Sequence, residues 1–252
     1  MIPWPASDRT RTRRPLGARR PSAAPDDGRD GTRSCAGLPG PDLNLALARY
    51  RELAGAYDLL TEWAAPYREQ AIDALELGRG ELVVDVGCGT GLNFSAIEDR
   101  IGARGALVGV DACPAMLDHA AKRARQAGWD NVELVCAPAE DARLPCPGDA
   151  MLLCATHDVL RSPTGLGNML GQLTAGAPVV AAGPKWAPWW LPGAAAINLA
   201  VWWINLPYVT TFEGFAHPWS HLHRFVEDLI VRQASSGTYY LASGRRPEPG
   251  PC

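Results

Sequence analysis

The chain has 252 residues, of which 47% are hydrophobic, so it can form one sizeable domain or two small ones around a real core. Its formal net charge of -3 gives no overall field that would attract nucleic acid or an anionic membrane. The seven cysteines include no CxxC pair, and no apolar run of signal-peptide type opens the chain. We therefore expect a reduced, cytoplasmic protein with free thiols.

Residues 1–41 are rich in Pro, Gly, Ser, Asp and Arg and show almost no apolar periodicity. Such a segment cannot bury enough surface to offset its ordering entropy. We expect a disordered tail, followed by one domain over residues 42–252. A nucleic-acid-binding arm or a transit peptide is the alternative interpretation, although acidic residues interrupt the arginines.

The remainder of the chain alternates between helical and strand-like patterns. Residues 42–78 carry apolar side chains at helical spacing and predict two or three helices. Strands are expected at 82–86, 106–111, 132–136, 149–154 and 178–182, and helices at 93–101, 113–128 and 166–175. Residues 229–246 predict an antiparallel hairpin around a Ser-Ser-Gly turn. This order is typical of an α/β fold with a mostly parallel, doubly wound sheet and helices on both faces.

Three glycines follow the first strand in "VVDVGCGTG", at Gly87, Gly89 and Gly91. Ligands of open α/β sheets bind beyond the carboxyl ends of the strands, where glycine lets the backbone come close to them. The spacing differs from the GxGxxG of NAD-binding proteins, and no GK[ST] ending indicates a P-loop. Asp85, just before the turn, disfavours a pyrophosphate and favours a cationic group.

A second acid, Asp111, stands at the tip of the next strand, 20 residues after Gly91. A carboxylate there can accept hydrogen bonds from both hydroxyls of a ribose. A purine would then fit beside Ala112 and Met116. A ribose, an adenine and a positive group without phosphate describe S-adenosylmethionine. A tight turn without any ligand is the alternative.

The motifs "VVDVGCGTG", "GVDACPAML" and "APAEDARLP" together resemble the successive cofactor motifs of class I S-adenosylmethionine-dependent methyltransferases, which include small-molecule, lipid and quinone modifiers. The resemblance covers about residues 50–246 and implies a Rossmann-like sheet of seven strands. It also implies that the glycine turn brackets the methionine part of the cofactor and that Asp111 binds the ribose. The turn of Ala139 and Glu140 would bind the adenine.

The resemblance implies further cofactor contacts. Because an amino-terminal helix covers the cofactor in similar methyltransferases, we expect Tyr57 and Tyr67 to close over it, with Arg68 near the methionine carboxylate. Ordinary packing of these side chains is the alternative. Cys88, within the glycine turn, and Cys154, at the end of the fourth strand, complete the expected contacts.

Position 138 departs from the family pattern. Many relatives carry an Asp where this chain has Pro138, and that carboxylate receives the adenine amino group. Glu140, Asp141 or the backbone of Ala139 would substitute for it here. The departure leaves open a protein that binds the cofactor without turnover.

The acceptor should approach the ends of the fourth and fifth strands, where His157 and Asp158 follow "CAT". Methyl transfer is an in-line displacement, and a base is needed only when the acceptor must lose a proton. His157 is our first candidate for a base or an acceptor-orienting group, with Asp158 beside it. Capping of the following turn, or a structural contact to the methionine end, is the alternative role for His157.

Residues 186–212 carry no charge and are rich in Trp and Pro. Prolines leave an apolar run at 193–206, which is shorter than the roughly 20 residues of a membrane span. We expect residues 186–228 to form a lid in which Trp202 and Trp203 face an apolar acceptor. A helix in a membrane interface or a dimer contact are the alternatives.

His217 and His221 are four residues apart, as in zinc-binding pairs, but no Glu, Asp or Cys completes a set, and we expect no metal. The sequence thus predicts a cytoplasmic enzyme, monomeric or homodimeric, that methylates a small, partly apolar molecule and binds no nucleic acid. Methylation of a membrane lipid headgroup amine is the alternative enzyme function.

Overall fold

The computed structural model describes residues 41–248, so the expected tail falls outside the described residues except for Pro41. The strands are β1 (Leu82–Val86), β2 (Ala106–Asp111), β3 (Val132–Cys136), β4 (Ala150–Cys154), β5 (Pro178–Pro184), β6 (Glu227–Ala234) and β7 (Tyr239–Arg245). The α-helices are α1 (Leu43–Leu53), α2 (Tyr57–Thr61), α3 (Ala65–Asp73), α4 (Phe94–Ile101), α5 (Pro114–Ala127), α6 (His157–Leu160), α7 (Pro163–Gly171) and α8 (Ala194–Asn205). Short 3₁₀ helices are η1 (Glu62–Ala64), η2 (Pro218–Arg224) and η3 (Ser235–Gly237).

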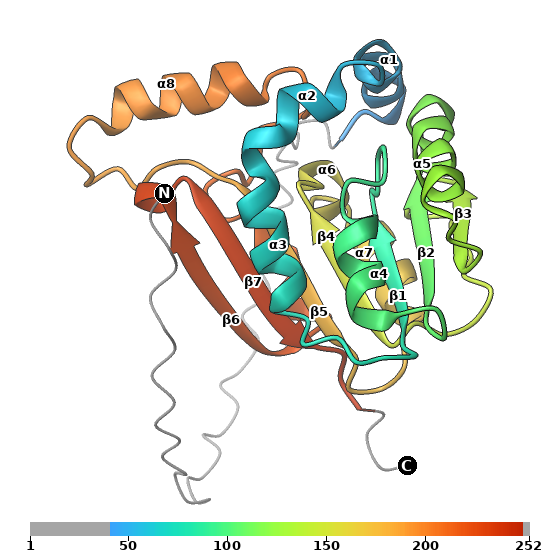
Figure 1. Cartoon of the computed structure of the whole chain (residues 1–252). Coiled ribbons are helices and arrows are strands. Elements are labelled where there is room, and N and C mark those ends of the chain that lie inside the picture. The colour runs from blue at the N-terminus through green and yellow to red at the C-terminus, as the bar shows by residue number, and fades with distance from the viewer. Residues whose placement is uncertain (1–40, 249–252) are drawn as a thin grey trace, which may run out of the picture.

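The strands form one seven-stranded sheet in the order β3-β2-β1-β4-β5-β7-β6 (Figure 1). Strands β1 to β5 pair in parallel, while β7 runs antiparallel to both β5 and β6. This confirms the predicted α/β fold with its antiparallel hairpin. The strand order reverses between β1 and β4, and ligands of such sheets bind at that reversal, beyond the carboxyl ends of the strands.

One helix begins earlier than the sequence pattern predicts. Helix α7 starts at Pro163 instead of residue 166 and ends at Gly171 instead of 175. Ser162 is its N-cap, with its hydroxyl accepting from the Gly165 amide at 3.1 Å, and Pro163 occupies the first turn. These are typical start signals of a helix, and they outweigh the apolar periodicity on which the expected boundary was based.

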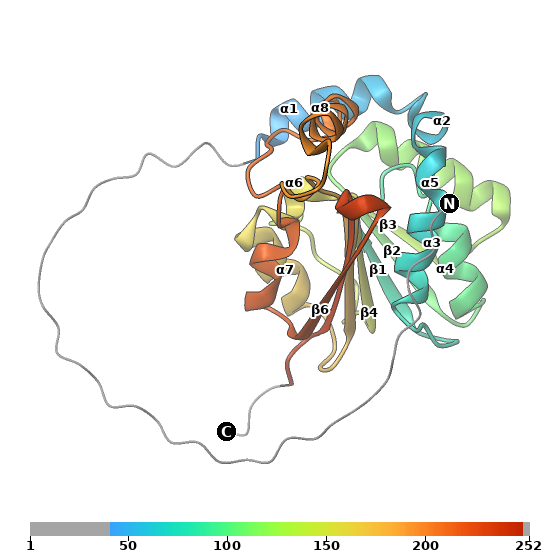
Figure 2. The same ribbon diagram turned by 90° about the vertical axis from the view of Figure 1, so that its left-hand side faces the viewer.

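Helices cover both faces of the sheet (Figure 2). Helices α3, α4 and α5 pack on one face, where Val83 of β1 joins Phe94 and Ile97 in a buried cluster. Helix α7 packs on the other face, where Val84 and Val86 contact its apolar side chains. Successive residues of β1 therefore point to opposite faces and are buried on both, as expected for a central parallel strand.

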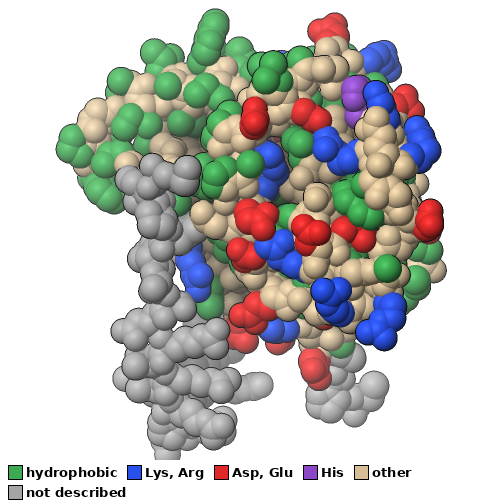
Figure 3. Space-filling model, viewed as in Figure 1, with side chains coloured by type: hydrophobic (Ala, Val, Ile, Leu, Met, Phe, Trp, Pro, Cys, Tyr) green, Lys and Arg blue, Asp and Glu red, His purple; other side chains and the backbone are tan. Residues whose placement is uncertain are grey.

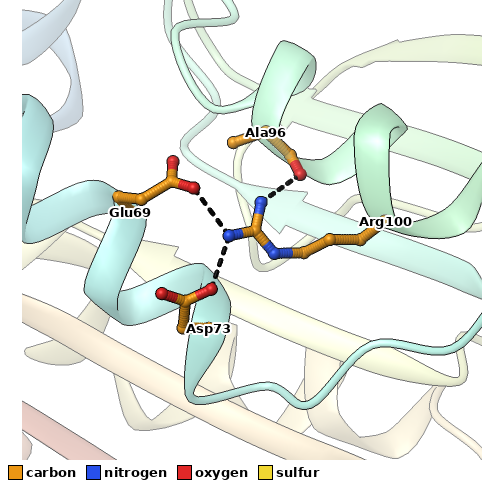
Figure 4. Close-up of polar contacts among 4 residues, drawn as sticks. All are labelled: Glu69, Asp73, Ala96 and Arg100. Carbon is orange, nitrogen blue, oxygen red and sulfur yellow. Dashed lines mark hydrogen bonds and ion pairs between the residues drawn. The ribbon is translucent and has the colours of Figure 1, made fainter.

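Arg100 on α4 fixes the position of α3 (Figure 4). Its guanidinium donates to the carboxylates of Glu69 at 2.6 Å and Asp73 at 2.5 Å, and to the carbonyl oxygen of Ala96 at 2.5 Å. Both carboxylates are more than half exposed, so each ion pair contributes at most about 1 kcal/mol. The contact holds α3, which carries Arg68, against the sheet.

Helices α1, α2 and α8 lie across the end of the sheet to which the parallel strands point (Figures 1 and 2). Arg49 of α1 donates to the carbonyl oxygens of Leu206 at 3.0 Å and Val209 at 2.6 Å. The Tyr50 hydroxyl donates to the Tyr208 carbonyl at 2.7 Å. The chain after α8 is thus tied to α1 above the sheet.

Residues 217–224 do not support a histidine pair of the zinc type. His217 is the N-cap of η2, and a 3₁₀ helix does not bring residues four apart onto one face. Across residues 41–248, no group of three or more His, Cys, Asp or Glu side chains is arranged to hold a metal ion.

Candidate active site

Two cavities adjoin each other at the carboxyl ends of β1 and β4. The first cavity has a volume of about 170 Å³ and lies toward β2 and α5. The second has a volume of about 490 Å³ and lies toward α3, β5 and β7. Seven residues line both, namely Tyr57, Gly87, Cys154, Ala155, Thr156, His157 and Tyr208. The shared wall is therefore built by the glycine turn and by the chain just after β4.

The first cavity is lined by acidic side chains, of which Asp111 is the best placed. Its Oδ2 accepts from the Gly89 amide at 2.9 Å, and its Oδ1 accepts from the Cys113 amide at 2.8 Å. Burial raises the pKa of Asp111, while these two amides favour its charged form. Each carboxylate oxygen has a further lone pair, so the group can accept from a pair of hydroxyls in the cavity.

The three glycines of the turn have different surroundings. All have positive φ, at +68° for Gly87, +56° for Gly89 and +78° for Gly91. A Cβ on Gly89 would meet nothing closer than 3.9 Å, whereas one on Gly91 would lie 2.8 Å from the ring of Phe94. Gly89 thus leaves open space beside the first cavity. Gly91 lines neither cavity, and the expectation that it contacts a ligand is corrected to a packing role.

Asp85 lies behind the cavity walls. Its side chain is fully buried and lines neither cavity, and both of its oxygens accept from Asn93 Nδ2, at 3.2 and 3.0 Å. Burial raises its pKa to about 7, partly offset by the Asn93 hydrogen bond. Asn93 does line the second cavity, and its Oδ1 has no hydrogen-bond partner within residues 41–248. The structure thus places Asn93 between the Asp85 carboxyl and the second cavity, so the expected influence of Asp85 on a ligand would act through Asn93.

The chain after β4 turns sharply into the site. Ala155 adopts φ +58°, in the left-handed region that is costly for a residue with a Cβ. This turn brings Thr156 and His157 to the shared wall of the two cavities. The Thr156 hydroxyl is buried and has no hydrogen-bond partner in the described part of the chain. Unpartnered buried polar atoms are rare in folded proteins, and a ligand is one way to satisfy them.

His157 is buried against the ring of Phe215, with ring centroids 4.9 Å apart. Its Nε2 lies 3.1 Å from the carbonyl oxygen of Glu213, which can only accept, so Nε2 carries the hydrogen. Burial lowers the pKa of His157 to about 4, despite this hydrogen bond. The imidazole is therefore neutral at pH 7, and its Nδ1 lone pair has no partner among the described residues.

Asp158 lines the first cavity, but its carboxylate is engaged by the chain after α8. It accepts from the Thr210 amide, at 3.1 Å to Oδ2, and from the Thr210 hydroxyl at 2.7 Å. Burial raises its pKa, and the Thr210 hydrogen bonds oppose the rise. These contacts make Asp158 an anchor for the chain at Thr210, and its expected catalytic role stays a prediction.

Tyr57 reaches both cavities because α2 is tied to the glycine turn. Asp58 accepts from the Thr90 hydroxyl at 2.5 Å and from Arg123 at 2.5 Å. Arg123 also donates to the Thr90 carbonyl at 3.0 Å. Tyr67 lies elsewhere: its ring stacks on Tyr239 at 4.3 Å and it lines neither cavity, so its expected cofactor contact is corrected to a supporting one.

Aromatic side chains and a single guanidinium characterise the second cavity. Its aromatic lining residues are Tyr57, Trp63, Tyr208, Tyr239 and Tyr240. Arg68 is the one Lys or Arg side chain among residues 41–248 that lines either cavity, and no Asp or Glu of that range lines the second cavity. Ile204, Asn205 and Val209 close it from the side of α8. Trp202 and Trp203 line neither cavity, which corrects their expected place facing the acceptor.

Comparison with known proteins gives consistent similarities. A family model described as "Methyltransferase domain" matches residues 83–172. The chain is 25% identical over 194 residues to aklanonic acid methyltransferase DauC of Streptomyces sp. (strain C5), an alignment that covers 71% of this chain and 87% of that protein. It is 29% identical over 97 residues to nocamycin O-methyltransferase of Saccharothrix syringae, covering 38% of this chain and 35% of that protein.

Among solved structures, the N-methyltransferase NodS from Bradyrhizobium japonicum WM9 in complex with S-adenosyl-L-homocysteine superimposes with a TM-score of 0.55. The two chains are 15% identical, and the match covers 81% of this chain and all of NodS. The methyltransferase domain, the relatives named as methyltransferases and the shared fold together support a class I S-adenosylmethionine-dependent methyltransferase. The ligand in that NodS structure, S-adenosyl-L-homocysteine, is the demethylated form of S-adenosylmethionine.

The site of this methyltransferase fits that cofactor on its own geometry. Asp111 presents a carboxylate to the first cavity, and Gly89 leaves space there that a Cβ would occupy. The unpartnered Oδ1 of Asn93 offers an acceptor for an ammonium group, with the buried Asp85 behind it. Neither cavity is lined by several cations that would suit a phosphate chain.

Most of the predicted residues of the methyltransferase site come together in the structure. Those that line the first cavity alone are Gly89, Asp111, Ala112, Met116, Ala139, Glu140 and Asp158. Those shared by both cavities are Tyr57, Gly87, Cys154 and His157, and Cys88 lines the second cavity alone. Sequence reasoning missed Asn93, Thr156 and Tyr208. The amide of Asn93, eight residues after Asp85, was a detectable signal, whereas Thr156 and Tyr208 have no motif that marks them.

Proposed function

We propose that this methyltransferase transfers a methyl group to an oxygen atom of a small, largely apolar molecule bound in the second cavity. The observation that carries the proposal is His157, whose neutral imidazole has an unpartnered Nδ1 on the wall between the two cavities. DauC and the nocamycin enzyme, which are named as small-molecule methyltransferases, support the same class of acceptor.

We infer that the first cavity holds the adenosine part of the cofactor. Asp111 would bind the ribose hydroxyls, with the adenine between Met116 and the turn of Ala139 and Glu140. The Glu140 carboxylate accepts a hydrogen bond from Ser162, which fixes its orientation. Pro138 lines this cavity without a polar side chain, so the backbone of Ala139 and the Glu140 carboxylate are the groups left to meet the adenine.

The methionine part would extend past the glycine turn toward the second cavity. Its ammonium group fits Asn93, which transmits the charge of Asp85 through the hydrogen bond at 3.0 Å. Its carboxylate fits Arg68, which donates to the Thr61 carbonyl at 2.9 Å and forms no ion pair with any described carboxylate. Charges of opposite sign would thus meet at both ends of the amino-acid group.

The lining of the second cavity favours a neutral or anionic acceptor. Its walls are aromatic, it contains Arg68, and no described carboxylate faces it. With Arg68 paired to the methionine carboxylate, a protonated amine placed there would be desolvated among aromatic side chains without a described carboxylate to pair with it. An aromatic molecule with a hydroxyl or carboxyl group fits better than a lipid headgroup amine.

When bound, S-adenosylmethionine supplies an electrophilic methyl group on a sulfonium centre. An acceptor hydroxyl near Thr156 and His157 would present an oxygen lone pair to that carbon, and the carbon–sulfur electron pair would leave with sulfur. The hydroxyl becomes strongly acidic as its oxygen forms the new bond, so even an imidazole whose pKa is about 4 can take the proton at Nδ1. A carboxylate acceptor needs no base, and His157 and Thr156 would only orient it.

Residues 204–209 would close this cavity as a lid. Asn205 is buried, Arg49 and Tyr50 tie the backbone of this segment to α1, and Asp158 holds Thr210 just beyond it.

The described cysteines are free thiols, which supports a cytoplasmic enzyme.

His157→Gln tests the proposed role, with His119→Gln on the exposed face of α5 as the matched control. We expect His157→Gln to lower kcat with hydroxyl acceptors by about 10²-fold or more, the usual effect of losing a positioned base, while the affinity for S-adenosylhomocysteine stays within about twofold. A His157→Gln variant with the kcat of the wild type, or with cofactor binding lost in proportion, would show that His157 is only structural.

A further inference from the structure

Helices α2 and α8, together with η1 and the loop before α8, expose apolar side chains that form what we call the tryptophan surface. Its members are Leu59, Leu60, Trp63, Trp189, Trp190, Leu199, Trp202, Trp203 and Ile204. Trp189 is 89% exposed, Trp203 70% and Leu59 77%. Figure 3 shows hydrophobic side chains gathered over α8, in contrast to the mixed charges on the rest of that face. Contiguous exposed apolar patches of this kind mark interaction sites.

Helix α8 is apolar around its whole circumference, yet little of it is buried. Within its 12 residues, only Ala194 and Asn205 are buried. Figure 1 shows the helix projecting beyond the sheet edge formed by β6. A helix without a polar face is normally buried on all sides, in a protein core or in a membrane. Most of the apolar surface of α8 is therefore exposed to solvent in the isolated chain, although a helix of this composition is normally covered.

The polar groups of α8 are directed to the protein itself. Its two asparagines are Asn198, which exchanges hydrogen bonds with the Ala187 backbone at 2.7 and 3.3 Å, and Asn205, which donates to the Val201 carbonyl at 2.8 Å. No Asp, Glu, Lys, Arg or His occurs between residues 186 and 212. The outward-facing side chains thus offer only hydrocarbon and indole N–H groups, which is what the interfacial zone of a bilayer accepts.

The tryptophan surface is continuous with the second cavity. Leu60, Trp63 and Ile204 line that cavity and are 46%, 57% and 50% exposed. Whatever covers the surface therefore also covers the rim of the cavity. An apolar acceptor dissolved in a lipid phase would reach the cavity without crossing water.

We propose that the tryptophan surface docks on the interface of a lipid bilayer, with α8 lying in the plane of the membrane. At 1.5 Å per residue the helix is about 18 Å long, well short of the roughly 30 Å hydrocarbon core. No helix within residues 41–248 has both the length and the hydropathy to cross a membrane. Two pairs of neighbouring tryptophans bracket the segment, Trp189 with Trp190 and Trp202 with Trp203, at the depth where indoles are enriched.

The absence of charge distinguishes a bilayer from other occupants of this surface. A second copy of the chain would meet the same α8 segment, which carries no charge, and no arginine of the kind enriched in protein interfaces is among the members of the surface. An exposed acid, Glu62, stands beside them, next to Trp63. Binding to a bilayer would also rest on apolar burial alone. It should therefore occur on zwitterionic lipid and resist salt, unlike the attachment of a basic surface to anionic lipid.

The test is flotation of the full chain with phosphatidylcholine vesicles, in parallel with the blue shift of tryptophan fluorescence. The variant is Leu199→Glu with Trp203→Glu, two residues outside both cavities, and the matched control is Ile230→Glu, an exposed aliphatic residue of β6. We expect the wild type and Ile230→Glu to float equally at low and high salt. The double variant should partition at least about tenfold less, a change of about 1.4 kcal/mol.

Three outcomes would overturn the proposal. One is failure of the wild type to float with any vesicle. Another is flotation only with anionic phosphatidylglycerol and its loss in salt. The third is a wild-type dimer by light scattering that the double variant converts to a monomer. Unchanged S-adenosylhomocysteine affinity in the double variant shows that it is folded. Methylation of a water-soluble acceptor should also persist in it, so failure of docking is distinguishable from failure of the proposed function.

Discussion

Replacing Asp85 with Asn should make the cofactor-free protein more stable, and increasingly so as the pH rises. The Asp85 carboxyl is fully buried, and burial raises its pKa from 3.8 to about 7, although Asn93 donates to it. The folded state therefore binds the proton more tightly than the unfolded state does. Stability from this group is fully present below the unfolded pKa and is lost as the pH rises through about 7.

The magnitude follows from these two pKa values. Relative to strongly acidic solution, the wild type should lose roughly 2 kcal/mol from this group at pH 5 and roughly 4 kcal/mol at pH 8. Asn has the shape of Asp, keeps an acceptor oxygen for Asn93 and does not titrate. The stability of Asp85→Asn relative to the wild type should therefore increase by roughly 2 to 3 kcal/mol between pH 5 and pH 8.

The assay is urea unfolding of both proteins at pH 5 and pH 8 without cofactor. The comparison requires that the free energy of unfolding depends equally steeply on urea concentration in both proteins. Other buried carboxyls titrate in both proteins, so the difference between the curves reports Asp85 together with its coulombic interaction with Asp111. A difference that stays constant with pH, or that shrinks toward pH 8, would refute the buried-carboxyl account. The same variant should bind S-adenosylhomocysteine more weakly, because Asn93 would no longer transmit a negative charge.

Three further predictions concern the rest of the site. Asp111→Ala should weaken S-adenosylhomocysteine binding, measured by calorimetry, more than Glu140→Ala does, because each hydroxyl bond to a carboxylate contributes about 1.5–3 kcal/mol; an unchanged Kd for Asp111→Ala would refute the ribose assignment. Asp158→Ala should release the segment after α8, seen as faster proteolysis at 205–212 and a lower Tm, and unchanged cleavage there would argue against the anchor. Gly91→Ala should lower Tm more than Gly89→Ala, because only a Cβ at position 91 collides with the buried ring of Phe94. Gly89→Ala should mainly weaken cofactor binding. A larger loss of Tm in Gly89→Ala would contradict these two roles.

The sequence predicts the cofactor half of the site well, because its residues follow directly from local order. A strand, a glycine turn and an acid at the tip of the next strand occupy adjacent positions in any parallel pair of this kind. Asp111 and Gly89 therefore reach the first cavity as expected. Asp85 shares that motif, but whether its carboxyl faces the ligand or the core depends on Asn93, whose side chain is inserted between Asp85 and the second cavity.

The acceptor half could not be predicted at the same level, because it is assembled from segments far apart in the chain. Tyr57 and Tyr67 look alike as aromatic residues on amino-terminal helices, yet only Tyr57 faces the cavities, since Tyr67 stacks on Tyr239 of the hairpin. The apolar character of Trp202 and Trp203 does not reveal whether they face a pocket or the solvent. That depends on how α8 is held at its ends, by contacts over more than 150 residues.

The most direct measurement of the proposed function is the position of the transferred methyl group. The full chain would be incubated with S-adenosylmethionine carrying a trideuteromethyl group and with pairs of aromatic compounds. In each pair, one compound carries a hydroxyl or carboxyl group where the other carries an amine. Fragmentation in the mass spectrometer then assigns the label to oxygen or to nitrogen. The account predicts label on oxygen, lost in His157→Gln when the acceptor is a hydroxyl. Label on the nitrogen of the amines, with their oxygen counterparts unreacted, would contradict it.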